Sequence, residues 1–133
     1  MRLEIVIPLP PISKKNHSRI VSVHGRPMIL PSKQYVQYEK DCALFMPRLD
    51  EPISTPVNVS AKFYMPTRRH CDLTNLLQAI DDILVKYEVL KDDNRNVVYA
   101  LDGSRVLYDK INPRTELVIT AIPDGEFERW ADG

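Results

Sequence analysis

The segment from Asp72 to Tyr87 carries the strongest structural signal in the sequence, and it limits the folds available to the chain. Its large apolar residues recur at intervals of three and four, so they fall within about 120° on a helix that advances about 100° per residue. They are Leu73, Leu76, Leu77, Ile80, Ile83, Leu84 and Tyr87. Because Thr74, Gln78 and Asp81 fall on the opposite side, the segment predicts an amphipathic helix with one buried stripe.

Other patterns predict a second helix, a hairpin and a set of strands around this helix. The second helix is expected from Ser32, a residue type that caps helices, to about residue 46. His24 and Gly25 predict the turn of a β-hairpin. Apolar or alternating stretches predict strands at 3–7, 57–65, 97–101 and 116–122, with a loop between the last two. This order predicts an α+β fold, a mixed β-sheet with two main helices packed on it.

The length of 133 residues is enough for one core, so we expect a single domain over 1–123. Residues 124–133 have no apolar periodicity and are expected to form a flexible tail. No stretch approaches the roughly 18 apolar residues that a membrane span needs, and the charged N-terminus does not resemble a secretory signal. A cytoplasmic protein without a membrane partner is therefore expected.

The charges are balanced in number but unevenly distributed. There are 18 basic and 18 acidic residues, which argues against a simple basic nucleic-acid-binding domain. Lys14, Lys15 and Arg19 nevertheless lie in the N-terminal third, and Arg68 and Arg69 precede a mainly acidic stretch at 72–93. A metal-dependent nuclease needs cations that hold phosphates around carboxylates that hold Mg²⁺. From composition alone, ordinary solvated charge is the better interpretation.

Four aspartates form a candidate metal site. Asp72 begins the predicted helix, Asp82 lies on the same edge of the helix, and Asp92 and Asp93 follow the next turn. If Val89 and Leu90 run back along the helix, Asp93 approaches Asp72. Converging carboxylates are costly unless a cation compensates them, and such a site can polarise a phosphodiester bond.

Each aspartate also has a purely structural interpretation. Asp72 is a favourable N-cap, Asp92 and Asp93 are ordinary turn residues, and Asp81 and Asp82 are expected to be exposed helix residues. On spacing alone, this structural interpretation is favoured.

Three segments shift the balance towards a nuclease. They are residues 68–76, residues 79–82 and residues 89–94, which follow a first strand that ends in prolines and the segment Ser13-Lys14-Lys15-Asn16. In this order they resemble the RusA family of Holliday-junction resolvases. The resemblance implies a Mg²⁺-dependent homodimer, with Mn²⁺ as a substitute metal, that nicks a four-way DNA junction symmetrically and is often encoded by phages or prophages of bacteria. In this sequence Asp72 matches the first catalytic aspartate and Asp93 the last, with Asp92 its neighbour, while Asn75 and Asp82 match further motif positions.

Two positions depart from the family pattern. Thr74 stands where the best-known members carry a second metal-binding aspartate, and Gln78 stands where they carry a lysine. Asp82 or Asp92 could supply the missing charge, and Lys14, Lys15 or Arg69 could replace the lysine. We interpret the chain as a subfamily form, with loss of catalysis as the alternative.

Three hypotheses follow. The first is a junction-resolving endodeoxyribonuclease whose Mg²⁺ is held by Asp72, Asp82 and Asp93, and whose DNA is gripped by Lys14, Lys15, Arg19, Arg68 and Arg69. The second is a protein of the same fold that binds branched DNA without cutting it. The third is a structural protein whose aspartates only cap and turn the chain.

Overall fold

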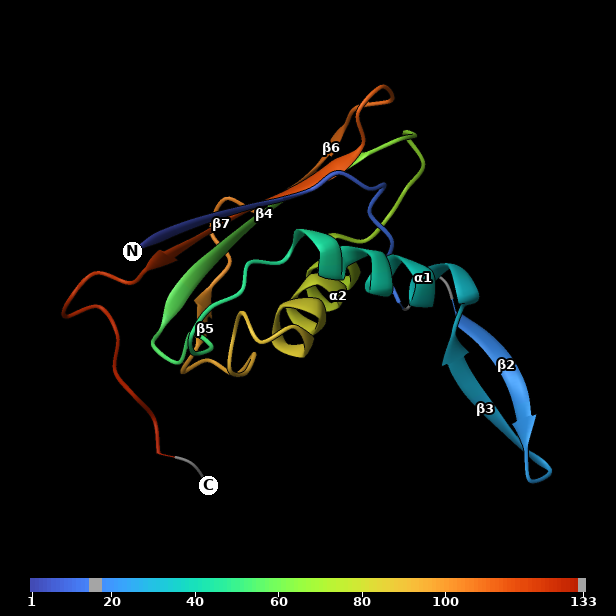
Figure 1. Ribbon diagram of the computed structural model, residues 1–133, viewed down its shortest axis with the longest axis horizontal. Coiled ribbons are helices and arrows are strands. Elements are labelled where there is room, and N and C mark those ends of the chain that lie inside the picture. Colours follow the sequence, from blue (N-terminus) through green and yellow to red (C-terminus); the bar gives the residue numbers. More distant parts are fainter. Residues whose placement is uncertain (15–17, 132–133) are drawn as a thin grey trace.

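The computed structural model describes residues 1–14 and 18–131, and in them a mixed five-stranded sheet carries two α-helices on one face (Figure 1). The central strands are β7 (Arg114–Ala121) and β4 (Val57–Met65), which pair antiparallel, and β1 (Arg2–Ile7) extends the sheet beside β7. The strands β5 (Val98–Ala100) and β6 (Arg105–Tyr108) both run parallel to β4 on its other side. The predicted α+β class is confirmed.

The two helices close the core against the sheet. In α1 (Lys33–Cys42), the Oγ of Ser32 accepts a hydrogen bond from the Tyr35 amide at 3.1 Å, as expected for a cap, and a 3₁₀ turn, η2 (Ala43–Phe45), continues the helix. The apolar stripe predicted for α2 (Leu73–Lys86) is buried along its middle, while Leu73 and Tyr87 at its two ends are partly buried. It shares the core cluster with the alternating inward residues of β4, which are Val57, Val59, Ala61 and Phe63.

A tight turn after α2 reverses the chain. Glu88 adopts a positive φ of 59°, and the amides of Val89 and Leu90 both donate to the carbonyl of Leu84, at 2.9 and 3.1 Å. Leu90 then pairs with Ile53 in an isolated bridge and is buried. The expected return of Val89 and Leu90 to the core is confirmed, and it directs the following residues, 91–96, towards the polar side of α2.

The prediction of a loop between the last two strands was wrong at β6. The chain turns at Gly103, where φ is 89° and a Cβ atom would lie 2.9 Å from the Ser60 Oγ. Ser104 then bonds to β4 through its Oγ, which accepts from the Ala61 amide at 3.0 Å. These long-range contacts with β4 hold β6 in the sheet. Its four residues are too few to show an alternating pattern in the sequence. The division into a domain at 1–123 and a tail at 124–133 stays a prediction.

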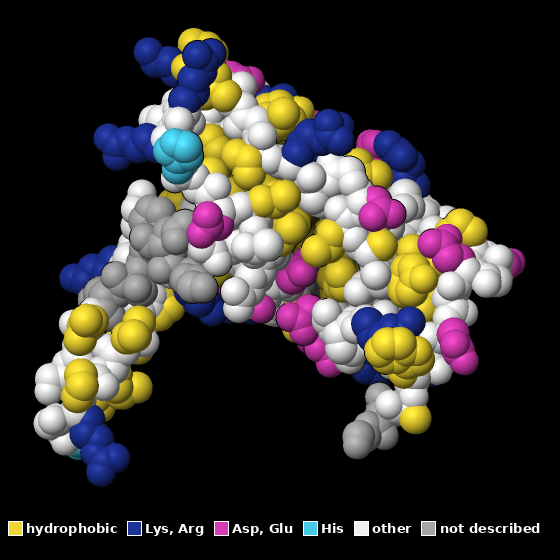
Figure 2. All heavy atoms as spheres, turned by 180° about the vertical axis from the view of Figure 1, so that it is seen from behind, with side chains coloured by type: hydrophobic (Ala, Val, Ile, Leu, Met, Phe, Trp, Pro, Cys, Tyr) yellow, Lys and Arg dark blue, Asp and Glu magenta, His cyan; other side chains and the backbone are white. Residues whose placement is uncertain are grey.

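The predicted hairpin is confirmed, and it forms an arm that projects from the body (Figure 1). It consists of β2 (Ser18–Val23) and β3 (Arg26–Pro31), with positive φ at both turn residues, His24 and Gly25. Ile20 and Ile29 are direct cross-strand partners, and they are 76% and 73% exposed. Figure 2 shows further hydrophobic side chains along the arm.

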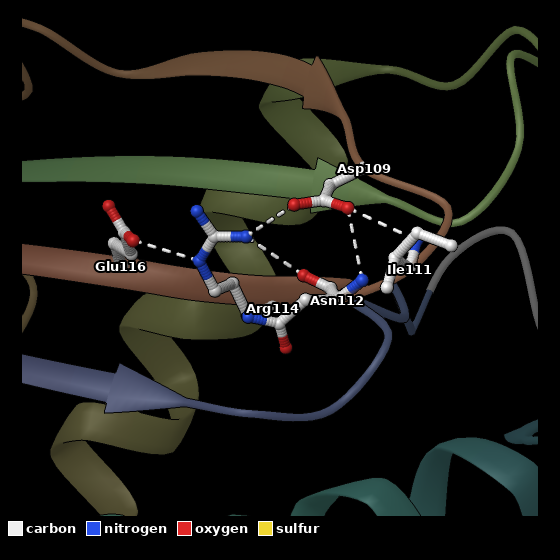
Figure 3. A network of polar contacts seen from close by, with 5 residues as sticks. All are labelled: Asp109, Ile111, Asn112, Arg114 and Glu116. Carbon is white, nitrogen blue, oxygen red and sulfur yellow. Dashed lines mark hydrogen bonds and ion pairs between the residues drawn. The ribbon is translucent and has the colours of Figure 1, made fainter.

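The loop between β6 and β7 is closed by a polar network around Arg114 (Figure 3). The Arg114 guanidinium donates to Asp109 Oδ2 at 2.9 Å, to Glu116 Oε2 at 2.8 Å and to the Asn112 carbonyl at 2.9 Å. It also lies 3.8 Å from the centroid of the Tyr64 ring. The other oxygen of Asp109 accepts hydrogen bonds from the Ile111 and Asn112 amides, which fixes the turn.

An Arg114→Ala variant is expected to lose about 1–2 kcal/mol of unfolding free energy, because its partners are left partly buried and unpaired. Arg114→Lys should recover only part of the loss, since lysine lacks the planar fork and the stacking surface. Urea unfolding measures both. Arg105→Ala, at an exposed position on the neighbouring β6, is the control and should change stability by less than about 0.5 kcal/mol.

Candidate active site

Asp72 occupies the N-cap position of α2, but its carboxylate does not cap the helix. Its carbonyl accepts the first helical hydrogen bond, from the Leu76 amide at 3.2 Å, and no cap bond is made by its side chain. Asp72 Oδ2 instead accepts from the Nδ2 of Asn75 at 3.1 Å, and Asn75 is only 8% exposed. Asp72 is therefore the N-cap residue, as the structural interpretation expects, but its side chain makes no cap hydrogen bond. A buried amide instead orients its exposed carboxylate.

Three carboxylates form a cluster at the other end of α2, which we call the acidic edge: Asp81, Asp82 and Asp93. Burial, followed by the charges of Asp93 and Asp82, raises the pKa of Asp81 to about 7. The pKa of Asp93 is also raised, mainly by burial, then by its hydrogen bond with Asp92 and by the charges of Asp92 and Asp82. Asp93 therefore lies within electrostatic range of the two helical aspartates.

The expectation that Asp81 is an exposed helix residue was wrong. Its Oδ1 atom is buried and has no hydrogen-bond partner among the described residues. The sequence held a signal for this, because Leu77 and Leu84 stand four residues before and three residues after Asp81, on the same side of the helix. Both leucines are buried, so the carboxylate between them is partly covered.

A pocket of about 470 Å³ lies between α2 and the base of the arm. It is lined by Lys14, Ile29, Leu30, Pro31, Asn75, Gln78, Ala79 and Asp82. The Nζ of Lys14 is 3.8 Å from Asp82 Oδ2 and 5.6 Å from the centroid of the Tyr35 ring. The pocket therefore brings Lys14 beside Gln78, the position at which the sequence lacks the expected lysine. Thr74 is exposed near the start of the helix.

A second pocket, of about 500 Å³, adjoins Asp72 at the N-terminal end of α2. Arg69 and His70 share this pocket with Asp72, and both are exposed. The guanidinium of Arg68 is 4.5 Å from the centroid of the Tyr108 ring, which holds it on the neighbouring surface. The basic run at 68–70 thus lies next to the first candidate aspartate.

The remaining predicted residues are placed as follows. Lys15 lies outside the described residues, and Arg19 belongs to β2 but its side chain is outside the described part of the structure. Asp92 is exposed; hydrogen bonds from the Asp93 amide and from Asn94 lower its pKa. Asp72 and Asp82 are separated by ten residues of helix, or about 15 Å, so they cannot both touch one ion. The convergence of Asp72 and Asp93 stays a prediction.

The chemistry of the acidic edge suits a divalent cation. Among the described residues, no group of three or more His, Cys, Asp or Glu side chains is arranged to hold a metal ion. Mg²⁺ commonly uses only one or two carboxylates and completes its shell with water and substrate phosphate. Carboxylates that raise one another's pKa, one of them with an unpartnered buried oxygen, match that donor set.

Acidic and basic side chains are separated on the surface of the molecule. Figure 2 shows acidic side chains at the border of the hollow between the arm and the body, whereas many Lys and Arg side chains lie along the upper edge of the molecule in that view. No helix in the described residues is long and apolar enough to cross a membrane, and the cytoplasmic location stays a prediction.

The sequence matches a known protein family. A family model described as "Endodeoxyribonuclease RusA" matches residues 8–120. The match spans the arm, both helices and the sheet except for β1 and the last residue of β7. It also includes every candidate residue of the two pockets and the acidic edge. No curated protein matches the chain.

Proposed function

Because the chain belongs to the endodeoxyribonuclease RusA family, which implies nuclease activity on Holliday junctions, we propose that it is a Mg²⁺-dependent enzyme that resolves four-way DNA junctions by paired nicks. The family match over residues 8–120 is the observation that carries this proposal. The acidic edge and the basic run at 68–70 support it, because they supply carboxylates for a cation and cations for the DNA backbone.

We assign the metal to Asp93 and Asp82, and a catalytic role to Asp72 at the start of α2. When bound, Mg²⁺ supplies polarisation of the phosphodiester bond and lowers the pKa of water. Asp92 is proposed to orient Asp93, since its carboxylate accepts from the Asp93 amide at 2.7 Å and from Asn94 Nδ2 at 3.1 Å. Asn75 orients the carboxylate of Asp72.

Lys14 is our candidate for the role of the family's lysine. Its ammonium group lies in the same pocket as Gln78, where the charge of Asp82 holds it at 3.8 Å. A cation at this position would stabilise the negative charge that builds on the phosphate during hydrolysis.

A homodimer is part of the proposal. A four-way junction has two equivalent strands to cut, and paired symmetric nicks require two active sites related by the same two-fold axis. A single subunit provides one acidic edge, so a second copy would supply the other.

An Arg69→Ala variant is expected to bind a four-way junction several-fold more weakly and to lower the slope of log affinity against log salt by about one. The physical reason is the loss of one phosphate contact beside Asp72. Filter binding at several salt concentrations measures the slope. Arg48→Ala is the matched control, because Arg48 is equally exposed but lies on the loop before β4, at the opposite end of that strand. An unchanged slope for Arg69→Ala would remove Arg69 from the DNA interface.

The direct experiment is incubation of the full chain with a synthetic four-way junction in the presence of Mg²⁺. We expect two nicks at symmetric positions, with ends that a ligase can reseal, and no cleavage of the matching linear duplex. Failure to cut in either Mg²⁺ or Mn²⁺ would overturn the enzyme assignment.

The second candidate function is recognition of branched DNA without cleavage. It is favoured by Thr74 and Gln78, which replace a carboxylate and a lysine of the family pattern. In that case the same junction would be retarded in a gel at Mg²⁺ concentrations that yield no product.

A further inference from the structure

Residues 124–131, for which the sequence predicts a flexible tail, lie against the turn that carries Asp93. Arg95 is the main contact: its Nη1 donates to the Glu128 carbonyl at 2.7 Å. Its guanidinium carbon is 4.0 Å from the ring centroid of Trp130 and 5.0 Å from that of Phe127. One basic side chain thus contacts two aromatic rings of the C-terminal segment.

Two further residues of the turn region bind the same segment. Asn96, only 8% exposed, accepts from the Trp130 amide at 3.3 Å and donates to the Trp130 carbonyl at 3.4 Å. Tyr99 donates to the Glu126 carbonyl at 3.4 Å, and its ring meets that of Phe127 edge-on with 5.5 Å between centroids. These contacts involve backbone and side-chain atoms of residues 95–99 and of residues 126–130, so they hold the C-terminal segment at several points.

A continuous series of hydrogen bonds leads from this contact to Asp93. The Asn96 amide donates to Asn94 Oδ1 at 2.9 Å, and Asn94 Nδ2 donates to Asp92 Oδ2 at 3.1 Å. The other oxygen of Asp92 accepts from the Asp93 amide at 2.7 Å. Residues 91–94 are exposed, so little core packing holds the turn in place.

We propose that residues 124–131 form a strap that positions the Asp93 carboxylate, acting through Arg95 and Asn96. The inference rests on the proposed function in one respect, the metal that Asp93 would hold. It goes beyond the family, because the family match ends at residue 120 and the strap follows it. Arg95, Asn96 and Trp130 are positioning residues: they touch neither the DNA nor the reacting atoms, and they restrict the turn that presents the carboxylate.

The test uses Trp130→Ala in the full chain, with Trp130→Phe as the conservative variant and Glu126→Gln as the control. Trp130 is 62% exposed, so its removal leaves the core intact. Glu126→Gln keeps the carbonyl that Tyr99 uses. We expect Trp130→Ala to weaken Mn²⁺ binding, measured by electron paramagnetic resonance, about tenfold, as is typical when a group that orients a metal ligand is lost. Trp130→Phe should recover most of this loss, and Glu126→Gln should behave as the wild type.

A second readout needs no metal. Amide hydrogen exchange of residues 92–96 should become about tenfold faster in Trp130→Ala, while the amides of β4 and β7 keep their protection. Unchanged exchange in the turn together with unchanged Mn²⁺ affinity would overturn the strap, as would uniformly faster exchange throughout the sheet. If the wild type binds no Mn²⁺ and leaves junctions intact, the proposed function fails, and the exchange experiment still decides the strap.

Discussion

An Asp93→Asn variant is expected to bind a four-way junction at least as tightly as the wild type and to cleave it at least a thousandfold more slowly. Asparagine keeps the size of the side chain but removes the charge that would hold Mg²⁺, and metal stabilisation of a phosphoryl transition state is worth several kcal/mol. At about 1.4 kcal/mol per tenfold in rate, that loss corresponds to roughly a thousandfold. Binding is retained because one negative charge beside the DNA has been removed.

The same change at Asp72 tests whether both residues serve one reaction centre. Asp72→Asn should be about as slow as Asp93→Asn, and the double variant should be no slower than either, because residues that act as a unit are not additive. Single-turnover cleavage at saturating Mg²⁺ measures all three. Asp50→Asn, at an exposed position on the loop before β4, is the control. Intact cleavage by Asp72→Asn would exclude Asp72 from the site.

In metal-free buffer, Asp81→Asn is expected to make the protein more stable than the wild type at about pH 8, by about 2 kcal/mol, and to have little effect at about pH 4. The ordinary carboxyl pKa is 3.8, whereas burial beside Asp93 and Asp82 raises the pKa of Asp81 to about 7. Between those values the unfolded chain has released a proton that the folded chain still binds. Wild-type stability is therefore lost as the pH rises from about 4 to about 7. Because solvent partly reaches Asp81, we expect a smaller stability difference than the full pKa shift would give.

Urea unfolding in the presence of EDTA, repeated across this pH range, measures the difference between the two proteins. Added Mg²⁺ should shrink it, because a bound cation favours the ionised carboxylates of the acidic edge. A difference that is constant with pH would mean that Asp81 titrates as an ordinary surface carboxyl. Glu88→Gln, an exposed change just beyond α2, serves as the control.

The sequence was most informative where a pattern is local and repeated. The stripe of α2 and the alternation of β4 both recur over several turns or residues, and both elements were found close to their observed bounds. The strand β6 was missed because its four residues are held by contacts with β4, more than forty positions earlier in the chain. A local sequence pattern cannot indicate pairing between strands that lie so far apart in the chain.

The candidate site was predictable only in part, for a similar reason. The order of the motifs in the sequence identified Asp72 and Asp93. The structure then places Lys14 in a pocket with Gln78, and Arg69 in a pocket with Asp72. Asp81 was missed because the period of the whole helix assigns it to the polar side, and only its two neighbouring leucines indicate that it is partly covered. The strap was missed because Arg95 stacks on aromatic rings that show no spacing in the sequence.

The turn at Glu88 has a consequence for how the protein reaches its native state. It lets one uninterrupted stretch, 81–93, build the acidic edge, whereas the sheet must join β1 to β7 from opposite ends of the chain. Closing a short loop costs little entropy, so the carboxylates can assemble without waiting for the slow non-local pairing. A circular permutant opened between β5 and β6 would accordingly keep this part of the molecule whole.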